Sequence, residues 1–140
     1  MNPSHADPAT APALPAVPLR PSGVRVLITD GLWPDGATAF VQRLFVGCSR
    51  CFLLQVLDPW ELAPTAAGAL TLVDVETGGR AQVQLAARAL QGYQERLGRL
   101  CDALRSCVLG HGGAYARVGA ATLPAMCERD LLPNRIVEPA

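Results

Sequence analysis

Three short apolar runs, separated by longer segments of helical character, constrain the fold of this chain most. The runs cover residues 24–30, 51–57 and 114–118, and each has the length and composition of a strand buried in a sheet. Apolar side chains recur at helical spacing between them, from about residue 34 to 47 and again from 86 to 109. This alternation favours an α/β fold with parallel strands and right-handed crossovers.

Two further elements complete the predicted order, β-α-β-hairpin-α-β-α. Apolar residues alternate on both sides of Gly78-Gly79, which predicts a β-hairpin over residues 69–85. A short helix is expected over residues 123–132, ended by Pro133. Residues 58–61 (Asp-Pro-Trp-Glu) are interpreted simply as a break after the second strand.

The first 22 residues are a different kind of segment. Their prolines are too dense for a packed element, because each removes a backbone donor and fixes φ; they are Pro3, Pro8, Pro12, Pro15, Pro18 and Pro21. We therefore expect a disordered leader over residues 1–22 and a single partial domain over residues 23–140.

Composition narrows the classes of function. The formal net charge is zero, so no long-range attraction to nucleic acid or to an anionic membrane is expected. The start of the chain lacks the features of a secretory signal, and the apolar stretches have strand length, so no membrane span is expected. Five cysteines form no even framework, which favours free thiols in a reducing cytoplasm.

Five segments, in order, resemble a bacterial group of von Willebrand factor A-like domains, the domain-of-unknown-function 58 family. The first is the strand that ends in Asp30-Gly31 and runs on to Gly36. The others are residues 55–62, 72–78, 93–97 and 129–132. The likeness covers about residues 23–138. It implies a partial doubly wound, Rossmann-like parallel sheet with an inserted hairpin and flanking helices.

The resemblance also implies a partner and a metal site. Members of the family are often encoded beside MoxR-type AAA+ ATPases and are thought to work with them. Their metal site uses an Asp-x-Ser-x-Ser motif on the first strand, and no such motif occurs in these 140 residues. Of that site only Asp30 carries over, and one carboxylate does not hold Mg²⁺. No cofactor is expected, and Mg²⁺ is expected only where a partner supplies the other ligands.

The same comparison predicts an interaction surface. In the family's fold the strand at 24–30 lies beside the first strand, so here it is expected to form an exposed edge through Val24, Val26 and Ile28. An apolar edge strand is a template for pairing with another chain, and Arg25 is the only charge within residues 24–29. The occupant can be a partner protein, the N-terminal half of the fold or a second copy. A poorly stable gene remnant is also open.

Enzymatic readings have less support in the sequence. Cys48 and Cys51 form a single CxxC at the end of a helix, whereas a redox site needs that motif at a helix N-terminus. His111 lies in a glycine-rich turn after the long helix, with no assignable nucleophile or orienting acid. We therefore expect a non-catalytic interaction module, and a small thiol- or metal-dependent redox protein using Cys48, Cys51 or His111 is the alternative.

Overall fold

A computed structural model describes residues 19–33, 36–64, 68–74, 77–119 and 122–139. Most of the expected leader, the Pro34-Asp35 helix start and Val75-Glu76 of the hairpin turn lie outside these residues. The chain divides into two compact units, one of residues 1–57 and 102–140 and one of residues 58–101. The helix α3 (Ala87–Gly110) contributes to both units.

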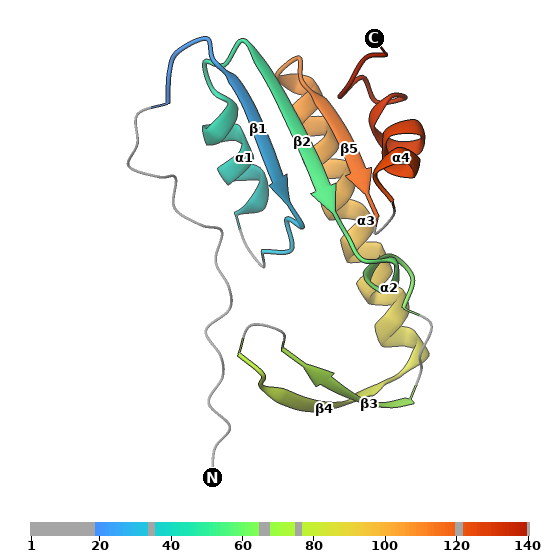
Figure 1. Cartoon of the computed structure of the whole chain (residues 1–140). Helices are drawn as coiled ribbons and strands as arrows, with labels where there is room; N and C mark the ends of the chain where they lie inside the picture. The colour runs from blue at the N-terminus through green and yellow to red at the C-terminus, as the bar shows by residue number, and fades with distance from the viewer. Residues whose placement is uncertain (1–18, 34–35, 65–67, 75–76, 120–121, 140) are drawn as a thin grey trace. The chain divides into compact units, whose positions relative to one another are not determined.

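The first unit contains a parallel sheet of three strands, in the order β1-β2-β5 (Figure 1). The strands are β1 (Val24–Thr29), β2 (Arg50–Val56) and β5 (Ala114–Val118). Val26 pairs with Phe52, and Phe52 pairs with Ala114, so these three side chains share one face of the sheet. The predicted α/β class with a parallel sheet is confirmed. Likeness to von Willebrand factor A domains remains a prediction.

Both crossovers of this sheet run in the same direction, from β1 to β2 and from β2 to β5. Right-handed crossovers in one direction place their helices on one face, and Figure 1 shows α1 (Ala37–Phe45) and the end of α3, from residue 102 on, behind the same side of the sheet. The main core of the unit lies there, because most of its fully buried side chains come from α1, β2 and the end of α3. They include Val41, Phe45, Cys51, Leu53, Gln55, Leu104 and Val108.

A glycine-rich turn ends α3 at Gly110, where the sequence predicts the helix to stop. Gly112 has a φ of 69°, and the amides of His111 and Gly113 both donate to the carbonyl of Val108, at 3.1 and 3.0 Å. A Cβ on Gly113 would lie 2.4 Å from Sγ of Cys51. The turn therefore packs directly on β2, and only glycine fits at position 113.

Among the described residues, the opposite face of the sheet is covered only next to β5. There α4 (Leu123–Met126) continues into a short π-helix, η1 (Cys127–Leu131). Ala116 and Val118 of β5 are buried with Leu131, and Leu54 and Ile136 pack partly against them. Together, α4 and η1 correspond to the helix predicted at residues 123–132.

The second unit contains the predicted hairpin, made of β3 (Gly68–Val73) and β4 (Arg80–Leu85), which pair antiparallel. It also contains α2 (Pro59–Leu62), where the sequence predicted only a break. The Asp58 carboxylate accepts a hydrogen bond from the Trp60 amide at 2.8 Å, and the Glu61 carboxylate accepts one from the Asp58 amide at 2.7 Å. This capping box begins a helix of one turn. Within the described ranges, no helix is long and apolar enough to cross a membrane.

Candidate protein-interaction surface

The residues predicted to form an exposed edge lie on one face of β1. Val24, Val26 and Ile28 are 62%, 56% and 65% exposed. They alternate along a strand at one end of the three-stranded sheet, so their side chains point to the same side. On β2 the half-buried Phe52 and Leu54 stand opposite Val26 and Ile28. We call these five side chains the open sheet face.

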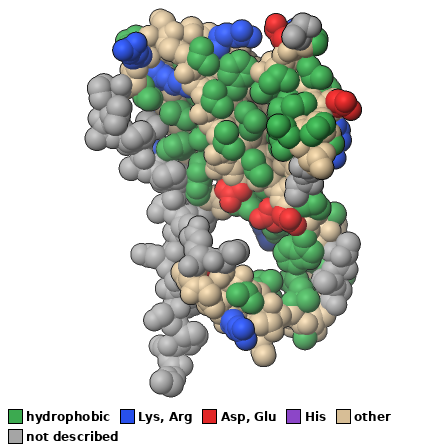
Figure 2. All heavy atoms as spheres, viewed as in Figure 1, with side chains coloured by type: hydrophobic (Ala, Val, Ile, Leu, Met, Phe, Trp, Pro, Cys, Tyr) green, Lys and Arg blue, Asp and Glu red, His purple; other side chains and the backbone are tan. Residues whose placement is uncertain are grey.

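Hydrophobic side chains gather over this part of the first unit in Figure 2, which has the same viewpoint as Figure 1. Ordinary surface apolar residues are scattered singly, and a contiguous group is the unusual case. Covering a Val or Ile side chain that is a little more than half exposed stabilises an assembly by about 1–2 kcal/mol. The open sheet face is therefore the strongest candidate binding surface in the described part of the first unit.

Arg25, the charged residue of β1, does not cover the open sheet face. The Arg25 guanidinium donates from Nη1 to the carbonyl oxygens of Leu44 and Val46, the second at 2.7 Å, and from Nη2 to that of Arg20 at 3.3 Å. Arg25 thus binds carbonyls at the end of α1, where a cation is favourable. Charged side chains that protect edge strands normally face the approaching strand, and Arg25 is engaged elsewhere.

Asp30 lies directly after β1, at the carboxyl end of the sheet. Its Oδ1 accepts hydrogen bonds from the Leu32 amide at 3.2 Å and from the Thr29 hydroxyl at 3.4 Å. The described ranges contain no group of three or more His, Cys, Asp or Glu side chains that could hold a metal ion. Asp30 shapes the turn after β1, and by itself it does not fit the ligand set of a Mg²⁺ site.

A buried polar network supports the Asp30 turn, and the sequence analysis missed it. Gln55 is 0% exposed in the middle of the sheet. Its Nε2 donates to the backbone oxygen of Asp30 at 2.8 Å, and its Oε1 accepts from the Tyr115 hydroxyl at 2.6 Å. A glutamine inside an apolar strand was the available signal, since buried amides need hydrogen-bond partners.

The structure brings Cys48 and Cys51 together, and both are free thiols. Burial, reinforced by the neighbouring Cys48, raises the pKa of Cys51 to about 11. Redox and nucleophilic cysteines need the opposite shift, because the thiolate is the reactive form. This environment disfavours thiolate chemistry at Cys51.

His111 is not directed at this thiol pair. Its backbone oxygen lies 3.9 Å from Sγ of Cys51, while its ring Nδ1 lies 2.8 Å from the carbonyl oxygen of Cys107. The imidazole therefore contacts the last turn of α3, as a residue of a helix C-terminal turn does. Catalytic use of His111 with Cys48 and Cys51 finds no support in this arrangement.

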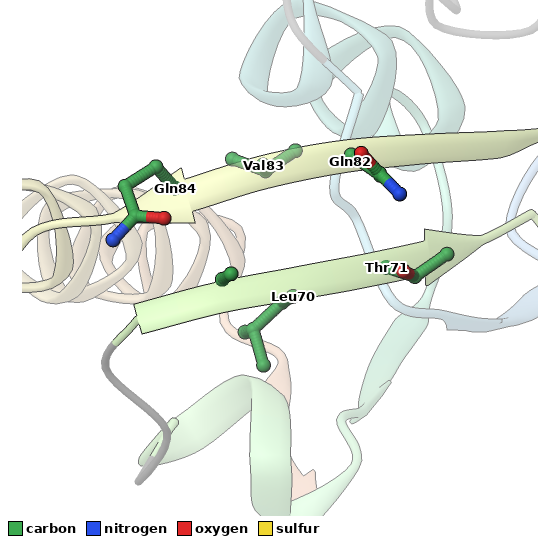
Figure 3. Close-up of a pocket in the computed structure, with 6 residues that line it drawn as sticks. Leu70, Thr71, Gln82, Val83 and Gln84 are labelled. Carbon is green, nitrogen blue, oxygen red and sulfur yellow. The ribbon is translucent and has the colours of Figure 1, made fainter.

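A hollow of about 330 Å³ lies over the hairpin, lined by residues 69–71 and 82–84. Figure 3 shows Leu70 directed away from the glutamine side chains of β4. The side chains around it are short, apolar or neutral amides. This lining supplies no ionisable acid or base that could activate the Thr71 hydroxyl, so the hollow does not carry a candidate active site.

No family model, curated protein or solved structure matches this chain.

Proposed function

We propose that this chain is a non-catalytic protein-interaction module that binds another polypeptide through β1 and the open sheet face. One observation supports the proposal most directly. Val24, Val26 and Ile28 are exposed on β1, which is an edge strand of the described sheet. Strand addition would satisfy the outer backbone groups of β1. Apolar side chains of the partner would cover the face.

The topology of the sheet favours a partner that brings both a strand and a helix. A doubly wound sheet covers its two faces by running in both directions from a central strand. The described strands run in one direction only, from β1 towards β5. A strand added beside β1, followed by a helix over Val26 and Phe52, would supply the second direction.

The family resemblance refines the proposal. If the fold is von Willebrand factor A-like, the partner would supply the strand that carries Asp-x-Ser-x-Ser. Mg²⁺ would then bind only where those ligands lie beside Asp30. A MoxR-type AAA+ ATPase is the class of partner system that the resemblance favours. The five thiols suit a reducing compartment such as the cytoplasm.

Charge substitutions on the open sheet face test the proposal. The full chain would be affinity-purified from its native host as wild type and as Val26→Lys, with Val73→Lys as the matched control. Val73 is 55% exposed on β3, which belongs to the other sheet. We expect the co-purifying protein to be lost with Val26→Lys and kept with Val73→Lys, while both variants retain cooperative thermal unfolding.

Amide hydrogen exchange on the purified complex supplies the second measurement. Binding by strand addition should slow exchange in residues 24–29. A partner that binds equally to Val26→Lys, or leaves exchange in β1 unchanged, would refute the proposed surface. Light scattering on the isolated chain identifies the remaining case: a dimer lost in Val26→Lys would mean that the occupant is a second copy.

A further inference from the structure

A second feature lies wholly within the unit of residues 58–101. A cavity of about 350 Å³ opens between α2, the hairpin and the first turns of α3. Its walls are mainly apolar, from Trp60, Pro64, Leu72, Leu85 and Leu90. Small-molecule sites have volumes of about 300–1,000 Å³, apolar walls and a few polar groups. This cavity fits a ligand near the lower end of that range.

Two hydrogen-bond donors stand on one side of the cavity. Tyr93 and Arg96 line it and are three residues apart on α3, so they share a face of the helix. A Cβ on Gly92 would lie 3.4 Å from Nη1 of Arg96, so the guanidinium folds back along α3 towards its N-terminus. Among the described residues, Arg96 makes neither a hydrogen bond nor an ion pair.

The acidic residue of the cavity is already engaged. Glu61 also lines it, and its carboxylate accepts the Asp58 amide hydrogen in the capping box of α2. Burial, then the charges of Glu61 and Cys101, raise the pKa of Tyr93. The phenol is therefore protonated at neutral pH and available as a donor. Among the described residues, Arg96 forms no ion pair with Glu61, so its guanidinium is the cation that a ligand in this cavity meets.

We propose that this cavity binds a small organic carboxylate whose apolar body is about the size of one aromatic ring. The body would lie among Trp60, Leu72 and Leu90, and the carboxylate would accept hydrogen bonds from Arg96 and Tyr93. A guanidinium and a carboxylate match in charge and in geometry. This ligand site is independent of the open sheet face and goes beyond the proposed function.

The test compares an acid with its uncharged amide. The probes are 4-phenylbutyrate and 4-phenylbutyramide, titrated against the full chain at neutral pH by isothermal calorimetry. The protein contains two tryptophans, Trp33 and Trp60. In a Trp33→Phe background, Trp60 fluorescence reports occupancy of the cavity, and phenylalanine keeps an aromatic ring against Phe40.

We expect the acid to bind at least roughly tenfold more tightly than the amide, as a charge-assisted hydrogen bond requires. Arg96→Gln should remove that preference and leave affinity for the amide unchanged. Arg99→Gln is the matched control, because Arg99 lies on α3 outside the cavity lining. Equal affinities for acid and amide, no binding of either, or an acid preference that survives Arg96→Gln would overturn the proposal.

Discussion

The Tyr115 hydroxyl donates a 2.6 Å hydrogen bond to Oε1 of Gln55 in the middle of the three-stranded sheet. Gln55 in turn donates to the backbone oxygen of Asp30, so a side chain of β5 is linked through β2 to the turn that follows β1. The network links all three strands of the sheet. It holds the turn after the strand that we propose binds a partner.

Removing the hydroxyl should destabilise the fold. Tyr115→Phe leaves Oε1 of the fully buried Gln55 without this donor, and an unsatisfied buried acceptor costs about 1–3 kcal/mol. Urea unfolding, followed by circular dichroism, measures the loss. Tyr93→Phe is the matched control, because no described residue accepts a hydrogen bond from its hydroxyl. Equal stability of the two variants would show that the Tyr115 hydroxyl contributes nothing.

Two glycines should respond to alanine in opposite directions. A Cβ at Gly113 would lie 2.4 Å from Sγ and 2.6 Å from the backbone oxygen of Cys51, so Gly113→Ala forces the turn away from β2. We expect a cost of about 1–3 kcal/mol in unfolding free energy, as for other overpacked sites. Gly98 lies in α3 with open space around its Cα.

Gly98→Ala should therefore stabilise the chain by about 0.5–1 kcal/mol, since alanine favours the helix interior. Thermal melts of the two variants beside wild type provide the comparison. A loss of stability at position 98 as large as that at 113 would argue that α3 does not take the described course at Gly98.

The strands and the long helix could be predicted because their signals are local. Hydrophobic periodicity fixed β5 at residues 114–118 and placed the other strands within one or two residues. The helix α2 was missed because one turn has no periodicity. The signal that existed was the Asp58 to Glu61 spacing of a capping box, which was read instead as a strand break.

The candidate surface was only partly open to prediction. The family resemblance suggested an exposed edge strand through Val24, Val26 and Ile28, and these three side chains are more than half exposed in the structure. That Arg25 binds carbonyl oxygens at the end of α1 depends on residues about twenty positions away. Gln55 and Tyr115 are 60 positions apart. Such contacts follow from the tertiary fold and leave no short-range pattern in the sequence.

Low pH should weaken the packing of η1 against β5. The Arg129 guanidinium donates two 2.8 Å hydrogen bonds to the Asp130 carboxylate, and this lowers the pKa of Asp130 despite its burial. Because the folded state favours the charged form, the stabilisation is present above the ordinary value of 3.8 and is lost as pH falls through the lower folded value.

Urea midpoints measured between pH 2 and 5 should therefore fall with pH more steeply for wild type than for Asp130→Asn. Arg129→Gln removes the cause of the shift and should flatten the profile in the same way. An acid profile unchanged by both substitutions would contradict an ionic contribution of this pair to stability.

The thiol of Cys51 should be unusually slow to react. Burial first, and then Cys48, raise its pKa from 9.0 to about 11, which lowers the thiolate fraction at pH 8 about 100-fold. We expect iodoacetamide labelling of Cys51 in the folded chain to be slower than in guanidinium chloride by at least that factor, as measured by peptide mass spectrometry. Cys48→Ser should change this rate little, because burial is the larger cause and remains. Rapid labelling at pH 8, or ready formation of a Cys48–Cys51 disulfide under mild oxidation, would instead favour the redox alternative over a purely structural role for the CxxC motif.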